Sequence, residues 1–185
     1  MTLRKTIEVV TKLADQGVIE KYAIAGAVAA LNYIEPMLTE DLDNPVSVGT
    51  FEMSRSGLIL LGAVEAALAK LGYTERKEAG IDVEGWPVQF LPVASNLDEE
   101  ALEQAAEVEF QSGGEAPIRA RILKAEYVVA NAVKLGRLKD LARVDAFVDQ
   151  KAVDLDKLKP ILERHGLMAA WKNFCRKAGK RVPLV

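Results

Sequence analysis

The chain of 185 residues contains only one cysteine, Cys175, and one histidine, His165. Structural zinc sites need several cysteine or histidine ligands and an internal disulfide needs two cysteines, so the sequence excludes both. Long apolar runs are also missing, because Ala23 to Leu31 and Leu58 to Val64 fall well short of the roughly 20 residues that cross a bilayer. The first residues are typical of an amphipathic helix rather than a signal peptide. We therefore expect a cytoplasmic protein that does not associate with membranes and keeps Cys175 reduced.

Charge is abundant and unevenly placed along the chain. Before Pro117 there are 8 basic and 20 acidic residues, and after it 16 basic and 7 acidic residues, so the two parts carry −12 and +9. Two interpretations remain open. Helix faces of opposite sign can simply attract one another in solvent, or an acidic lobe can hold a divalent metal while a basic lobe attracts phosphate.

The apolar pattern predicts an α+β fold. It indicates a first helix that ends near Gly17, a strand and helix on either side of Gly26, a strand around Leu42 and a helix over 58–72. Short strands follow over 73–95, 108–111 and 117–123, with a helix from Asn96 between them. From Lys124 onward only helical patterns remain, over 124–136, 137–150, 154–166 and 167–179. We expect a mixed sheet flanked by helices over 1–122, and a helical lobe over 123–185 packed against it.

Gly26 and Ala27 are predicted to lie where a strand turns into a helix, and Asp41 and Asp43 on the strand that follows. A glycine turn lets backbone amides approach a phosphate at a helix N-terminus. Two aspartates at positions i and i+2 of a strand project from the same face and offer the hard oxygen ligands that Mg²⁺ binds. An isolated Asp-x-Asp is more often a pair of solvated acids, so the pattern gains meaning only from its context.

That context resembles the polymerase-beta-type nucleotidyltransferase superfamily, in particular its small bacterial members and the nucleotidyltransferase toxins of abortive-infection systems. Members have a hydrophobic strand that ends in a glycine turn, then a helix, a threonine and Asp-x-Asp, and IAGAVAALNYIEPMLTEDLD is similar. The resemblance extends from about Tyr22 to Gly166. It implies that Asp41 and Asp43 hold Mg²⁺ or Mn²⁺, and that Gly26, Ala27 and Thr39 take part in nucleotide binding.

The segment AEYVVANAVKLGRLKDLARV resembles the helical signature of the same family. The resemblance implies nucleotide-binding roles for four of its residues, namely Lys134, Arg137, Lys139 and Asp140. On a helix, residues three apart are neighbours, so the cations could together neutralise phosphates. The segment could instead be a helix junction with solvated charges in which Asp140 only caps or pairs.

Three positions depart from the family pattern. Gln89 stands where the third metal-binding carboxylate is expected, Ala27 replaces a small polar residue or glycine, and Met37 replaces an arginine. Glutamine carries no charge and cannot accept the proton of an attacking hydroxyl, so a ligand and a general base are both affected. Asp82 or Glu84 could substitute for the missing acid.

The resemblance implies a metal-dependent nucleotidyltransferase that moves a nucleoside monophosphate from a nucleoside triphosphate to a hydroxyl of RNA, protein or a small molecule, as part of a toxin or defence system. The departures leave a second possibility open: a catalytically impaired module of the same fold that binds nucleotide or RNA and acts through a partner such as an antitoxin. A purely structural protein is the third possibility, but it would leave the charge division without a ligand to explain it.

Overall fold

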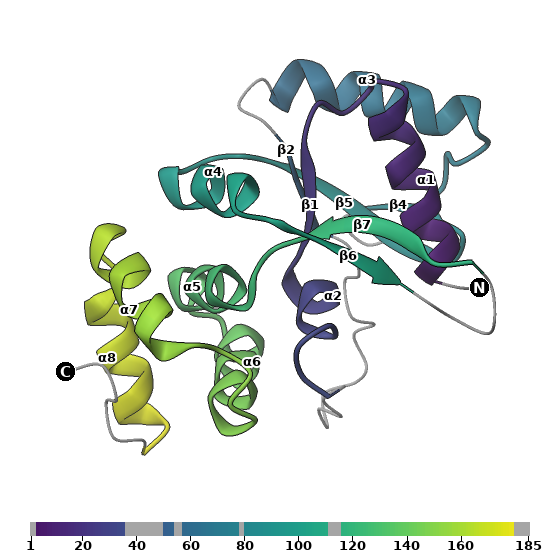
Figure 1. Cartoon of the computed structure of the whole chain (residues 1–185). Coiled ribbons are helices and arrows are strands. Elements are labelled where there is room, and N and C mark those ends of the chain that lie inside the picture. The colour runs from purple at the N-terminus through teal and green to yellow at the C-terminus, as the bar shows by residue number, and fades with distance from the viewer. Residues whose placement is uncertain (1–2, 36–49, 54–56, 78–79, 111–115, 180–185) are drawn as a thin grey trace. The chain divides into compact units, whose positions relative to one another are not determined.

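The computed structural model describes residues 3–35, 50–53, 57–77, 80–110 and 116–179, and it shows an α+β fold (Figure 1). In the described residues the helices are α1 Leu3–Asp15, α2 Gly26–Ala30, α3 Gly57–Lys70, α4 Asn96–Glu103, α5 Ala125–Leu135, α6 Leu138–Asp149, α7 Leu155–Arg164 and α8 Met168–Lys177. The strands are β1 Tyr22–Ala25, β2 Thr50–Met53, β3 Arg76–Lys77, β4 Gly80–Val83, β5 Trp86–Pro92, β6 Ala106–Phe110 and β7 Ile118–Ile122.

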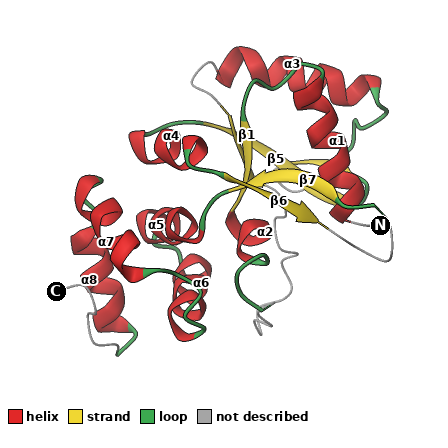
Figure 2. Cartoon of the chain, in the orientation of Figure 1, coloured by secondary structure: helices red, strands yellow, loops and turns green. Residues whose placement is uncertain are grey.

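The strands form a mixed sheet (Figure 2). Their order across the sheet is β3-β4-β5-β2-β1-β7-β6. Strand β1 runs antiparallel to β2 and parallel to β7, and β2 runs parallel to β5. The β3–β4, β4–β5 and β6–β7 pairs are antiparallel. Because β1 has neighbours on both edges and all four of its residues are buried, it is a central strand of the core.

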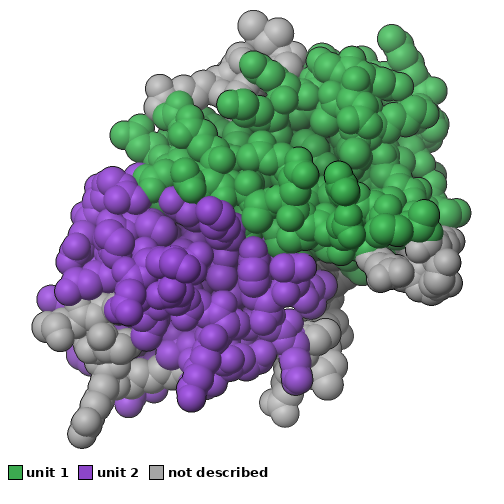
Figure 3. Space-filling model, viewed as in Figure 1, with its two compact units in different colours: residues 1–28, 41–123 green, residues 29–40, 124–185 purple. Residues whose placement is uncertain are grey.

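Two units divide the chain, one of residues 1–28 and 41–123 and the other of residues 29–40 and 124–185 (Figure 3). The first unit contains the sheet. Helix α1 packs against β7 and α3 against β5. The buried stripe of α1 consists of Thr6, Ile7, Val10 and Leu13, and the Thr6 hydroxyl donates a 3.0 Å hydrogen bond to the Val83 carbonyl of β4. Buried residues at three- and four-residue spacing thus form one face of α1, and this face packs on the sheet.

The second unit is helical, with α5 in contact with α6, α7 and α8. Seven of the eleven residues of α5 are buried, so this helix is the centre of the unit. Trp171 of α8 is fully buried and lies 5.5 Å from Phe174 between ring centroids. Phe147, Leu158 and Leu162 complete this core from α6 and α7. Burial of such side chains contributes about 1.5–3 kcal/mol each.

The structure confirms the α+β class, the strand before Gly26, the helix predicted over 58–72, which spans Gly57–Lys70, and the run of four C-terminal helices. The helix predicted from Asn96 is also confirmed, since Asn96 is the first residue of α4. Ser95 caps this helix, and its hydroxyl accepts from the Asp98 amide. The helix after Gly26 is short and ends at Ala30. The strand predicted around Leu42 lies outside the described residues. None of the described helices is long and apolar enough to cross a membrane.

Candidate functional site

The predicted site residues fall into three groups. Gly26, Ala27 and Gln89 belong to the first unit, and Lys134, Arg137, Lys139 and Asp140 belong to the second. Thr39, Asp41 and Asp43, together with Met37, lie outside the residues that the structure describes. The geometry of the site is therefore built from the first two groups, each within its own unit.

Gly26 follows the buried strand β1 and begins α2. Its φ of +63° lies in the left-handed region, where a residue with a Cβ pays a steric cost and glycine does not. This backbone conformation explains why glycine is used at the junction. Ala27 is half-buried, whereas Val28, Ala29 and Ala30 are buried. The expected strand, glycine turn and helix are confirmed as local structure, although α2 has only five residues.

Gln89 lies on β5, where it pairs with Thr50 of the parallel strand β2. Its neighbours Val88 and Phe90 are 1% and 7% exposed, whereas Gln89 is half-buried. Alternation along a strand places Gln89 on the face opposite to these two core residues. Gln89 is thus on the less buried face of the sheet.

Asp82 of β4 and Glu84 of the β4–β5 turn, the two acids that could replace a carboxylate at Gln89, both have structural partners. Asp82 Oδ1 accepts a 2.7 Å hydrogen bond from the Gly85 amide, and its Oδ2 lies 4.0 Å from Lys77 Nζ. Glu84 Oε1 accepts a 2.6 Å hydrogen bond from the Tyr73 hydroxyl. These contacts tie Asp82 to the turn and Glu84 to the chain after α3. Over the described part of the chain, no group of three or more acid, histidine or cysteine side chains is arranged to hold a metal ion.

The α5–α6 junction exposes a continuous cationic segment. Helix α5 ends at Gly136, whose φ is +65° and whose amide donates to the Ala132 carbonyl, and Arg137 then starts α6 in an extended conformation. All six residues of 134–139 are exposed, and Leu138 is 88% exposed. The expectation that Lys134 and Arg137 are neighbours on one helix is wrong, because the left-handed Gly136 and the extended Arg137 separate α5 from α6. Lys134, Arg137 and Lys139 nevertheless share one solvent-accessible stretch, as a phosphate contact requires.

Asp140 is the buried member of this segment, with a side chain only 2% exposed. Its Oδ2 accepts from Arg137 Nε, its Oδ1 accepts from Arg137 Nη2 at 3.3 Å, and Oδ1 also accepts from Arg143 Nη1 at 3.1 Å. A buried carboxylate normally needs such charged partners, because desolvation of an unpaired charge is costly. Asp140 is thus bound by two guanidinium groups.

Arg143 was not among the predicted residues. It is three positions after Asp140 on α6, and its side chain is 18% exposed. The spacing of i and i+3 on a helix is a general signal for such a pair, and it could have identified Arg143 once α6 was predicted.

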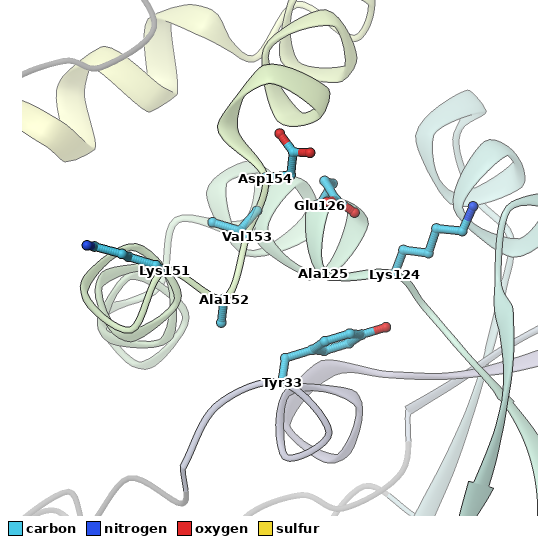
Figure 4. A pocket seen from close by; sticks show the side chains of 8 residues that line it. All are labelled: Tyr33, Lys124, Ala125, Glu126, Lys151, Ala152, Val153 and Asp154. Carbon is cyan, nitrogen blue, oxygen red and sulfur yellow. The ribbon is translucent and has the colours of Figure 1, made fainter.

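A cavity of about 390 Å³ lies within the second unit (Figure 4). It is lined by residues of the segment after α2, of the start of α5 and of the α6–α7 connection, namely Tyr33, Lys124, Ala125, Glu126, Lys151, Ala152, Val153 and Asp154. The Tyr33 ring forms one wall. Burial, together with the negative charge of Glu126, raises the pKa of Tyr33 to about 12, so its hydroxyl remains protonated at neutral pH. None of these lining residues belongs to the predicted site.

Cys175 and Trp171 are core residues, at 1% and 0% exposure. A buried thiol is shielded from solvent and reacts poorly, so Cys175 serves as a packing residue of this core.

No protein-family model and no curated protein sequence matches this chain.

Proposed function

We propose that the protein is a metal-dependent nucleotidyltransferase that transfers a nucleoside monophosphate from a nucleoside triphosphate to a hydroxyl group. In this reaction the acceptor oxygen forms a bond to the α-phosphorus, the bond from that phosphorus to the pyrophosphate oxygen breaks, and the hydroxyl proton passes to a base. Such a reaction needs a negatively charged metal site and cations for the triphosphate. The chain provides both kinds of residue.

The observation that carries the proposal is the exposed segment 134–139 with its anchored arginine. Lys134, Arg137 and Lys139 are exposed together, and the buried Asp140 holds the Arg137 side chain by two hydrogen bonds. Cations held at one place can neutralise a polyphosphate at a smaller entropic cost than freely moving side chains. The glycine turn at Gly26 supports the same function, since its backbone conformation allows close approach of a phosphate.

The acids Asp41 and Asp43 supply the donor type that suits Mg²⁺ or Mn²⁺, since both ions prefer hard oxygen ligands. The amide oxygen of Gln89 is a weaker, uncharged ligand of the same type. When bound, the metal neutralises charge on the triphosphate and lowers the barrier to displacement. In this proposal Thr39 supports the site, and nucleotide-binding roles fall to Gly26 and Ala27 in the first unit and to Lys134, Arg137 and Lys139 in the second.

The test is transfer of label from the α-phosphate of each nucleoside triphosphate to RNA or to protein, with Mg²⁺ or Mn²⁺ present. We expect labelled product from the wild-type protein and none from the Asp41→Asn, Asp43→Asn double variant. Asp15→Asn is the matched control, because Asp15 is an exposed acid at the end of α1. The proposal fails if no acceptor is labelled, or if the double variant labels as well as the control.

A catalytically impaired module that binds nucleotide or RNA, and that acts through an antitoxin-like partner protein, is the second candidate. It is favoured by Gln89 in place of an acid and by the structural partners of Asp82 and Glu84. Without a third carboxylate the reaction lacks its expected base. Calorimetry with a nucleoside triphosphate and Mg²⁺ separates the candidates: binding without turnover supports the module, and multiple turnover excludes it.

A further inference from the structure

Arg137 is held by Asp140 through one edge of its guanidinium group. The bonds from Nε and Nη2 to the Asp140 carboxylate occupy the side edge of the group. The Nη1 group and the outer N–H of Nη2 form the end edge, which takes no part in this pairing. Since the Arg137 side chain is 56% exposed, the end edge can meet a ligand while the side edge stays bound to Asp140.

Arg137, Asp140 and Arg143 form a charged cluster, and the exposure of the two arginines determines which of them presents its net positive charge to solvent. Arg143 Nη1 also binds Asp140 Oδ1, and its side chain is much less exposed than that of Arg137, at 18% against 56%. One carboxylate and two guanidinium groups leave one net positive charge. Because Arg143 is the more buried partner, that charge is presented to solvent mainly by Arg137.

From these contacts we infer that Asp140 is a positioning residue, which orients Arg137 so that the guanidinium end edge donates two hydrogen bonds to one phosphate group. Asp140 touches neither the phosphate nor a metal ion. The inference rests on the proposed triphosphate-binding function and assigns the role of one residue within it. Arginine suits this task and lysine does not, because only a planar guanidinium can bind a carboxylate and a phosphate through two separate edges.

The role of Asp140 can be tested by the direction in which its substitution changes anion binding. If Asp140 acted only through its charge, Asp140→Asn would strengthen binding of inorganic tripolyphosphate, since a nearby negative charge is removed. If it orients Arg137, the same substitution weakens binding by about tenfold, because the arginine must then be ordered by the ligand. If it were a metal ligand, the loss would appear only when Mg²⁺ is present.

The experiment is calorimetric titration of the full chain with inorganic tripolyphosphate, once with EDTA and once with Mg²⁺. We expect Asp140→Asn to bind about tenfold more weakly in both buffers, and Asp149→Asn to bind as well as wild type or slightly better. Asp149 is the matched control because it is an exposed acid at the end of the same helix. Unchanged or tighter binding by Asp140→Asn with EDTA, or a loss confined to Mg²⁺, overturns the inference.

A spectroscopic signature tests the orientation itself. The Arg137 Nε–H group should give a slowly exchanging NMR signal in the wild type and in Asp149→Asn, and this signal should be lost in Asp140→Asn. Persistence of the signal in Asp140→Asn overturns the inference. If that variant does not fold, Arg137→Lys replaces it: a lysine keeps the charge but not the two edges, so tripolyphosphate binding should again fall about tenfold. Wild-type affinity in Arg137→Lys would contradict the inference.

Failure of the inference and failure of the proposed function give different results. If the wild-type protein transfers label and its Asp140→Asn variant binds tripolyphosphate normally, the proposed function is supported and the positioning role of Asp140 is wrong. If tripolyphosphate binding depends on Asp140 and Arg137 but no acceptor is labelled, the positioning role of Asp140 is supported and the proposed catalysis is wrong.

Discussion

The hydroxyl of Tyr73 donates a 2.6 Å hydrogen bond to Oε1 of Glu84. Tyr73 follows α3, and Glu84 lies in the β4–β5 turn with a φ of 56°, so the bond ties the chain after α3 to a strained turn. The position of Glu84 is therefore explained by local structure. Its interaction with Tyr73 is also the largest cause that raises the pKa of Tyr73 to about 12, and burial adds to it.

The first prediction concerns alkaline titration of Tyr73. A raised pKa means that the folded state favours the neutral phenol, so the interaction stabilises the fold below the ordinary pKa of 10.0 and this stabilisation is lost as the pH rises through about 12. Glu84→Gln removes the negative charge beside the phenol. We expect the pKa of Tyr73 to move down toward its ordinary value, as measured by the ultraviolet absorbance of tyrosinate.

Two variants assign the late titration to the correct residues. Tyr33 also has a pKa raised to about 12, but its causes are burial and Glu126, so Glu84→Gln should leave it unchanged. Tyr73→Phe should remove one late-titrating group and Tyr33→Phe a second, while Tyr22, whose pKa is raised by burial, remains in both variants. A titration curve that is the same in Glu84→Gln and in wild type would contradict the Tyr73–Glu84 hydrogen bond.

The strongest periodic patterns in the sequence were sufficient to predict most elements of the fold. In α1 the apolar residues recur at helical spacing, and the same positions, such as Ile7 and Val10, are buried. The C-terminal helices were equally clear. The order of the strands in the sheet could not be predicted, because no local sequence pattern indicates that β1 lies between β2 and β7. Strand pairing depends on contacts between residues far apart in the chain.

The residue types of the candidate site and the spacing that allows them to pair could be predicted, but the choice between pairing and ligand binding could not. The pattern around Arg137 left open whether Asp140 binds a ligand or pairs within the helix, and the structure shows the pairing with Arg137 and Arg143. Burial decides the matter, since a carboxylate at 2% exposure needs cationic partners. The burial of Asp140 depends on tertiary packing, so it could not be predicted from the spacing of residues in the sequence. The metal-binding roles of Asp41 and Asp43 stay a prediction.

The second prediction concerns Gly80 at the start of β4. A Cβ at this position would lie 2.5 Å from the carbonyl oxygen and 2.7 Å from the carbonyl carbon of Val88, which belong to the backbone of β5. Backbone atoms of a paired strand cannot move without disturbing the ladder. We expect Gly80→Ala to lower the free energy of unfolding by about 2 kcal/mol, measured by urea denaturation.

Gly62 provides the control for Gly80. It is an exposed residue within α3, and nothing lies within 4 Å of a Cβ built there. Alanine favours the helix over glycine, so Gly62→Ala should raise the free energy of unfolding by about 0.5–1 kcal/mol. The same substitution thus changes stability in opposite directions at two sites. Destabilisation of equal size at both would show that the close approach of β4 and β5 is wrong.

The third prediction compares two helix ends. Lys151 follows α6 with a φ of 53°, and Gly136 follows α5 with a φ of 65°. This left-handed conformation costs a residue with a Cβ about 1 kcal/mol. Lys151→Gly should therefore stabilise the protein by about 1 kcal/mol, and Gly136→Ala should destabilise it by a similar amount.

Steric overlap is not the cause at Gly136, since the nearest atom to its Cβ would be the Val133 carbonyl oxygen at 3.9 Å. Thermal unfolding of both variants gives the measurement. If Lys151→Gly is less stable than wild type, the loss of contacts from the lysine side chain outweighs the relief of backbone strain, and the prediction is wrong.

The fourth prediction asks whether Gln89 limits catalysis. Gln89 lies on the less buried face of β5, beside β2, and in the proposed function it occupies the position of a third metal-binding acid. Aspartate at this position would add a charged ligand and a proton acceptor. We expect Gln89→Asp to increase Mg²⁺-dependent label transfer by about tenfold or more, and to tighten Mg²⁺ binding in calorimetry.

Leu91 offers the matched control for Gln89. It lies two residues further along β5, so it shares the face of Gln89, and it is 36% exposed. A carboxylate introduced by Leu91→Asp adds the same charge to the same face at a different position along the strand. Label transfer should stay at the wild-type level in this variant. Equal stimulation by both variants would mean that added negative charge alone is responsible. If Gln89→Asp does not stimulate label transfer, Gln89 does not occupy the position of a missing metal ligand. Ala27 and Met37, the other two departures from the family pattern, would then be the next residues to substitute.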